Sequence, residues 1–173
     1  FLAINLNQGG SLDNFQPGLD FFKALKDAGS LNTIDVTDAT IDSGQTGVVF
    51  DWSYNQAAIK ERLSKQQNVD WEVLTLPNGE VEQYYNQAVN KDAPHPAAAR
   101  LWEEYLYSPD AQNEWMRGGA IPSLLEKMKK DGTVDKDALA KLPEIKKPVT
   151  YTSKQADAMT TWLGKNWPKT IGN

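Results

Sequence analysis

This chain of 173 residues has no cysteine and a single histidine, His95. Without cysteine it forms no disulfide framework and no thiolate metal site, and one histidine gives no histidine-rich metal spacing. No hydrophobic run approaches the roughly 18 residues that a membrane-spanning helix requires. A phosphate-cradling glycine loop and a Gly-x-Ser-x-Gly elbow are also missing. We therefore expect no catalytic residue, no metal and no cofactor.

The charge balance is acidic, with a formal net charge of −5. Nucleic acids and anionic membranes are bound through clustered Lys and Arg. The basic clusters at residues 127–130 and 146–147 are short and lie among acidic residues, which is typical of a solvated surface. Adjacent helical carboxylates such as Glu103 and Glu104 point about 100° apart and do not converge on one atom. We predict no nucleic-acid partner and no acid–base pair of an enzyme.

The first residues, 1–7, lack an initiator Met, a basic n-region and a helix cap. A secretory signal peptide would begin with such a basic region. We expect a mature or cut chain, whose signal peptide is not part of this sequence.

Hydrophobic periodicity and turn residues predict the helices and strands. Helices are expected at residues 14–29, 55–66, 96–117 (as a pair), 123–130, 135–142 and from 153 onward. Apolar or alternating runs predict strands at 47–51, 71–76 and 82–89. The polar, turn-rich residues 30–46 predict a short helix or a linker. Strand, helix, strand, strand and then helices is the order of an α/β protein.

The turn after the first predicted strand carries the side chains best suited to a ligand. Trp52 and Tyr54 are aromatic, Ser53 has a hydroxyl, Asn55 an amide and Asp51 a charge. In open α/β sheets, ligands bind beyond the carboxyl ends of strands, where helix N-termini offer unpaired amides. The alternative interpretation is structural, with Ser53 only capping the helix and Trp52 only packing in the core.

The adjacent tyrosines Tyr84 and Tyr85 are the second candidate for ligand binding. Neighbouring residues on a strand face opposite sides, so at most one of the two points into a given cleft. A tyrosine pair at an interface explains the same residues equally well.

The six tryptophans divide by position. Helical apolar faces, and therefore the core, are expected to hold Trp102, Trp115, Trp162 and Trp167. Trp71 opens a predicted strand and is expected at an interface. Only Trp52 lies where a ligand could reach it.

Residues 91–123 read as two capped amphipathic helices in series. Pro96 leads into the first helix, and Ser108-Pro109-Asp110 gives the second a cap, a proline and an acidic first turn. Gly118-Gly119 stops the second helix. The apolar face of the first helix is formed by Leu101, Trp102, Tyr105 and Leu106.

The sequence of this stretch resembles the late segment of the extracellular solute-binding proteins that serve bacterial ABC importers. The resemblance is carried by Ala93-Pro94-His95-Pro96, Leu101-Trp102, Ser108-Pro109, Gln112, Gly118-Gly119 and Ile121-Pro122. It explains His95 as part of the family phrase. In that family the glycine segment, residues 118–122, resembles a loop that returns toward the hinge, so we treat it as structural and only adjacent to ligand.

The resemblance implies an α/β fold of type II periplasmic-binding-protein lobes. Because family members are longer than this chain, it corresponds to the carboxyl-terminal half of an incomplete two-lobe fold. Residues 1–80 would belong to the second lobe, 81–122 would cross into the first lobe with its helices, and 123–173 would return. The missing amino-terminal half, or a second chain, would then cover exposed sheet edges and helix faces.

The function that the resemblance implies is that of the substrate-binding component of an ABC transporter. Such a protein is periplasmic or extracellular and is not an enzyme. It closes at its hinge over a small polar solute and delivers the solute to a membrane permease. The same fold also serves as the ligand-sensing effector domain of regulators, and this alternative stays open.

The sequence is similar to those of the family branch that binds polyamines, iron and phosphonates. Iron-binding members typically carry a tyrosine pair where this chain has Trp52-Ser53-Tyr54, which counts against iron. A polyamine would favour Trp52 and Asp51, through cation–π attraction and charge. A phosphonate or another oxyanion would favour Ser53, Asn55 and the helix amides.

Overall fold

The computed structural model describes residues 1–65 and 69–172, and packing divides the chain into two units. Unit 1 comprises residues 1–50, 74–83 and 144–173, and unit 2 comprises residues 51–73 and 84–143. The chain therefore passes between the units four times. The predicted lobes came from the resemblance and not from packing, so their boundaries stay a prediction.

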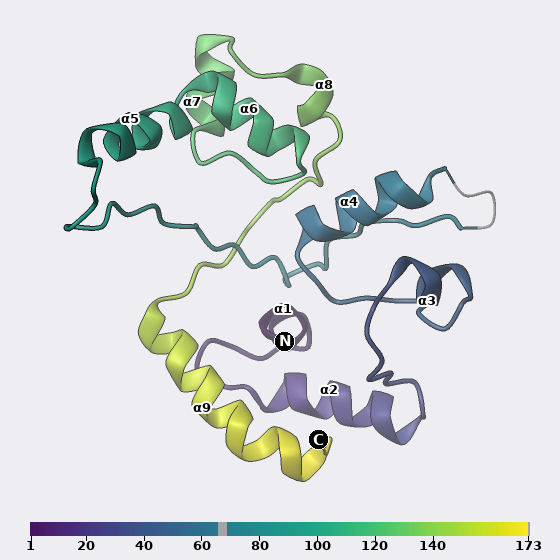
Figure 1. Cartoon of the computed structure of the whole chain (residues 1–173). Coiled ribbons are helices and arrows are strands. Elements are labelled where there is room, and N and C mark those ends of the chain that lie inside the picture. Colours follow the sequence, from purple (N-terminus) through teal and green to yellow (C-terminus); the bar gives the residue numbers. More distant parts are fainter. Residues whose placement is uncertain (66–68, 173) are drawn as a thin grey trace. The chain divides into compact units, whose positions relative to one another are not determined.

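Unit 1 brings the two ends of the chain together. Its helices are α1 (Leu2–Asn7), α2 (Gln16–Asp27), α3 (Asp38–Asp42) and α9 (Ser153–Thr170), and α2 contacts both α1 and α9 (Figure 1). Pro17 stands in the first turn of α2, and Gly29, with a φ of 68°, follows its end. Thr152 and Gln155 form a capping box at the start of α9. The helices predicted at residues 14–29 and from 153 onward are thus confirmed, whereas α1 was not predicted.

Aromatic rings form the core of unit 1. Phe22 is buried, and its ring centroid lies 5.3 Å from that of Trp167, 5.9 Å from Phe50 and 6.0 Å from Phe1. Such stacked, tilted and edge-to-face pairs contribute about 0.5–1.5 kcal/mol each beyond the burial of apolar area. The rings come from α2, from α9 and from the chain near residues 1 and 50, so they join segments that are far apart in sequence.

A buried amide fixes the loop between α1 and α2. Asn5 is fully buried and donates from Nδ2 to the carbonyls of Ser11 and Asn14, at 3.0 and 2.9 Å. Its Oδ1 accepts the Gly18 N–H at 2.9 Å. The Asn5 amide thus makes hydrogen bonds through both its nitrogen and its oxygen, which offsets the cost of burying this polar side chain.

The three predicted strands are not formed in residues 1–65 and 69–172. The described residues contain one isolated parallel bridge, between Val81 and Val149, with the Val149 N–H donating to the Glu80 carbonyl at 2.8 Å. A strand is stable only beside neighbouring strands, and in the apolar run at residues 47–51 no strand among the described residues pairs with the chain, so that Val48 is 75% exposed although Phe50 packs against Phe22. The α/β assignment, and with it the type II two-lobe fold, stays a prediction.

Unit 2 contains five helices among its described residues. They are α4 (Ser53–Leu63), α5 (Pro96–Leu106), α6 (Pro109–Arg117), α7 (Leu125–Asp131) and α8 (Lys136–Leu139). As predicted, the Ser108 hydroxyl caps α6, accepting the Ala111 N–H at 3.3 Å, and Gly118 and Gly119 end the helix. Gln66, the predicted end of α4, lies outside the described residues.

Buried side-chain amides connect the helices of unit 2 to its loops. Asn113 donates to the Thr133 carbonyl at 2.9 Å and accepts the Asp135 N–H at 2.8 Å. Gln112 donates to the Leu106 carbonyl at 2.6 Å and accepts the Leu124 N–H at 3.3 Å. These two neighbours on α6 thereby hold the chain before α6, between α6 and α7, and before α8.

Two of the four tryptophans predicted in the core are exposed. Trp102 on α5 and Trp115 on α6 are each 53% accessible, and α5 has no buried residue. An amphipathic face shows which residues share one side of a helix, but it does not show that a partner covers that side. Trp162 and Trp167 are partly buried, and Trp162 packs against Phe15 with ring centroids 5.7 Å apart.

No helix in the part of the chain that the structure describes is both long and apolar enough to cross a membrane.

Candidate functional site

The first turn of α4 holds most of the predicted ligand residues. Trp52 occupies the N-cap position in an extended conformation, with ψ of 137°, and Ser53 is the first helical residue. The interpretation of Ser53 as the N-cap is therefore wrong, because the cap residue is the tryptophan. The Trp52 side chain is 42% exposed, so its apolar surface is only partly used in packing.

Asp51 holds this turn together. Its Oδ1 accepts the Trp52 N–H at 2.7 Å and the Asn55 Nδ2 at 3.2 Å, and its Oδ2 accepts the Gln56 Nε2 at 2.9 Å. A carboxylate at a helix N-terminus also interacts favourably with the helix dipole. The charge of Asp51 is thus fixed in direction at the start of α4.

Gln56 links the carboxylate to a second segment of unit 2. It is buried, and its Oε1 accepts the indole N–H of Trp71 at 3.1 Å. The ion pair between Lys60 and Glu72, with the charged atoms 2.9 Å apart, holds the same segment beside α4. Neither Gln56 nor Trp71 was predicted at this site. Trp71 was expected at an interface. In the sequence, the spacing of five positions between Asp51 and Gln56 is the only indication that these two side chains could meet.

A tyrosine pair joins the two predicted candidate segments. The hydroxyls of Tyr54 and Tyr85 lie 2.7 Å apart, although 31 positions separate them. This hydrogen bond, and then partial desolvation, raises the pKa of Tyr54 above its usual 10.0, and the charges of Tyr85 and Asp51 act in the same direction. The Tyr54 phenol is therefore neutral near pH 7. Tyr84 is 60% exposed, and Tyr85 is the member of the pair that meets Tyr54.

The loop after α6 packs on the first turn of α4. A Cβ built on Gly119 would lie 3.1 Å from the Cβ of Ala57 and 3.4 Å from the Cα of Tyr54. Gly119 also has a φ of +86°, which strongly favours glycine. The loop at Gly119 therefore lies against the candidate site, and the interpretation of residues 118–122 as structural and only adjacent to ligand stays a prediction.

We call the resulting cluster the Asp51 turn, and it consists of Asp51, Trp52, Tyr54, Asn55 and Tyr85. It presents one carboxylate, one half-exposed indole ring, an amide and two phenol hydroxyls. Trp52 and the carboxylate suit a cationic group, and the hydroxyls and the amide suit polar neighbours of that group. Among the described residues no cluster of three or more His, Cys, Asp or Glu side chains is arranged to hold a metal ion.

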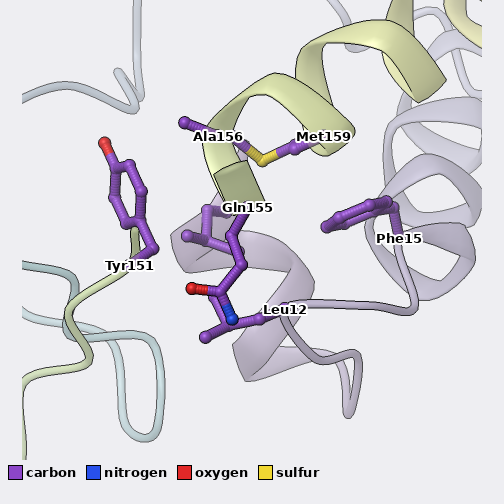
Figure 2. Close-up of a pocket in the computed structure, with 7 residues that line it drawn as sticks. Leu12, Phe15, Tyr151, Gln155, Ala156 and Met159 are labelled. Atoms are coloured by element: carbon purple, nitrogen blue, oxygen red, sulfur yellow. The ribbon is translucent and has the colours of Figure 1, made fainter. Parts of the chain in front are cut away.

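A separate small hollow lies in unit 1, between α9 and the chain before α2 (Figure 2). It is open to solvent and leaves no enclosed space for even a water molecule, and Leu12, Phe15, Tyr151, Gln155 and Met159 are among the residues that line it. Sites for small molecules usually have about 300–1,000 Å³. This hollow is therefore a packing gap and not a ligand site.

Comparison with protein families gives a match over most of the chain. The model of the family described as bacterial extracellular solute-binding protein matches residues 3–144. This range contains the whole Asp51 turn. A comparison with curated proteins gave no match.

Proposed function

The chain belongs to the bacterial extracellular solute-binding proteins, and we propose that it is the substrate-binding component of an ABC importer. In this role it captures a small polar solute in the periplasm or outside the cell and delivers it to a membrane permease. The proposed role is binding and release without chemistry. The family supports a solute and a transporter as partners, and the Asp51 turn supports the place at which the solute is held.

The observation that carries the proposal is the fixed carboxylate of Asp51, followed in the chain by Trp52, whose side chain is 42% exposed. Asp51 is held by hydrogen bonds from Trp52, Asn55 and Gln56. A cation over the face of a tryptophan gains about 0.5–2 kcal/mol, and a nearby carboxylate adds charge attraction. We propose that the solute carries an ammonium group, as polyamines do.

An oxyanion such as a phosphonate fits this turn less well. It would use the amides at the start of α4 and the side chains of Ser53 and Asn55. The carboxylate of Asp51 already lies at that helix end and would repel an anion. In addition, the Asn55 amide donates to Asp51, so an anion would compete for that donor.

The proposal includes a second lobe that closes over the Asp51 turn. We propose that it is an amino-terminal half or a second chain, as in the type II periplasmic-binding-protein fold. The exposed apolar side chains of α5, which include Leu101, Trp102 and Tyr105, support the presence of a covering partner.

Calorimetric titration of the chain with putrescine, spermidine, a phosphonate, ferric ion and a sugar tests the proposal. We expect the amines to bind and Trp52→Ala to weaken the better amine roughly tenfold, the size of one cation–π contact. Trp102→Ala is the matched control, because this tryptophan is also about half exposed, at 53% against 42% for Trp52, but lies on α5. Equal effects of the two variants, or tighter binding of the phosphonate, would contradict the proposal.

A further inference from the structure

We propose that Asn55 and Gln56 are specificity-determining residues, which make the Asp51 turn accept a primary ammonium group and reject a guanidinium group. This inference rests on the proposed function, because it concerns the same solute site. It adds to that function a discrimination between two classes of organic cation.

The orientation of the Gln56 amide follows from its partners. An indole N–H can only donate, so the oxygen of Gln56 must be the atom that faces Trp71. The amide nitrogen of Gln56 then necessarily faces Asp51 and donates to its Oδ2. Trp71 therefore fixes which atom Gln56 presents to the carboxylate.

The acceptor sites of the carboxylate are nearly filled. A carboxylate offers about four lone-pair sites, two on each oxygen. On Oδ1 the Trp52 N–H and the Asn55 amide use both sites, and on Oδ2 the Gln56 amide uses one. Counting the hydrogen bonds from the described residues, one site on one oxygen is left for a solute.

The remaining site distinguishes the two cations by geometry. An ammonium group can satisfy a single acceptor with one N–H and turn its other two donors to water or to nearby oxygens. A guanidinium group binds a carboxylate best through two parallel N–H groups, one to each oxygen. Because Oδ1 is filled, the guanidinium would have to give up its second bond or displace Asn55.

The test compares putrescine with 1,4-diguanidinobutane, which has the same four-carbon chain and a guanidinium at both ends. We expect the dissociation constant of the diguanidine to be roughly tenfold higher, the effect of one charge-assisted hydrogen bond left unmade. Asn55→Ala frees one site on Oδ1, and since Asn55 is exposed, the fold should tolerate the change. In this variant we expect the ratio of the two dissociation constants to fall to about two or below.

The matched control is Trp52→Ala, which should weaken both cations by a similar factor and keep their ratio. A merely structural effect of Asn55→Ala would also leave the ratio unchanged, and that outcome would overturn the inference. If both cations bind with equal affinity to the unaltered chain, the inference fails while the proposed function stands. If neither cation binds, the proposed function fails and the inference falls with it.

Discussion

The two units of this chain hold distant segments together through different interactions. In unit 1 the rings of Phe1, Phe22, Phe50 and Trp167 bring distant segments together. In unit 2 the buried amides of α6 hold the loops through hydrogen bonds to the backbone. Removing a packed ring destabilises the fold in proportion to the volume of the cavity that is left. Removing a buried amide destabilises the fold because the backbone partners of the amide are left unpaired.

The candidate ligand turn lies in the unit whose loops are held by the buried amides of α6. The Asp51 turn belongs to unit 2, and it uses the same device, a buried amide that bridges two segments. Gln56 connects Asp51 to Trp71, as Asn113 connects α6 to the chain before α8. Hydrogen bonds fix the direction of polar groups more sharply than ring packing does, which suits a site that must present a charge in one direction.

The largest effect is expected from removing the central ring of unit 1. Phe22→Ala should destabilise the chain by about 3–5 kcal/mol, because it leaves a cavity among several rings. Urea denaturation with amide hydrogen exchange would measure the loss and locate it. Tyr107→Ala, at an exposed aromatic residue of unit 2, should change the stability by about 0.5 kcal/mol or less. Similar losses in the two variants would break the comparison.

The next effect concerns the amides of unit 2. Asn113→Ala leaves the Thr133 carbonyl and the Asp135 N–H without their side-chain partner, which should cost about 1–3 kcal/mol. Hydrogen exchange at residues 133–138 should accelerate while unit 1 keeps its protection. Asn5→Ala is the matched variant in unit 1 and should accelerate exchange at Gly18. Unchanged exchange at Asp135 in Asn113→Ala would contradict the role assigned to the amide.

Helix caps should contribute equally to both units. Ser108→Ala at α6 and Thr152→Ala at α9 should each cost about 1 kcal/mol, because each hydroxyl accepts a first-turn N–H. Thermal unfolding of the two variants measures this, and Ser108→Thr, which keeps the hydroxyl, is the control. A large difference between the two caps would show that one unit depends more on local structure than the other.

The smallest effect is an acid dependence confined to unit 2. The Ala138 N–H, and then Arg117, lower the pKa of Asp135 below its usual 3.8. A carboxyl with a lowered pKa stabilises the fold above pH 3.8, and this contribution is lost as the pH falls through the folded-state value. Asp135→Asn should therefore flatten the acid limb of stability below that pH. Added salt should reduce the same contribution, because the ion pair is exposed to solvent.

Helix positions were the most predictable part of the fold. The start of α6 at Ser108, its end at Gly118 and the opening of α9 at residue 153 all follow from hydrogen bonds that span three or four residues. Such bonds depend on the neighbouring sequence alone. The predicted strands at 47–51, 71–76 and 82–89 did not form among the described residues, since a strand depends on partners elsewhere.

The residues of the candidate site could be predicted from the sequence, but the contacts between distant residues of the site could not. Asp51, Trp52 and Asn55 were expected together because they are consecutive or nearly so. The contact between Tyr54 and Tyr85, and that between Gln56 and Trp71, depend on the path of the chain between them. Exposure was the other unpredicted property, as Trp102 and Trp115 show.

By itself, the sequence determined the boundaries of α6, the start of α9, the family and the residues around the start of α4. These follow from helix caps, residue spacing and sequence motifs, each of which depends only on residues close together in the sequence. Only the tertiary structure decided that Tyr85 meets Tyr54, that Gln56 orients Asp51 and that rings from both chain ends pack around Phe22. The physical reason is that these contacts require distant segments to meet. Their geometry is set by packing around a shared core, and no local pattern encodes it.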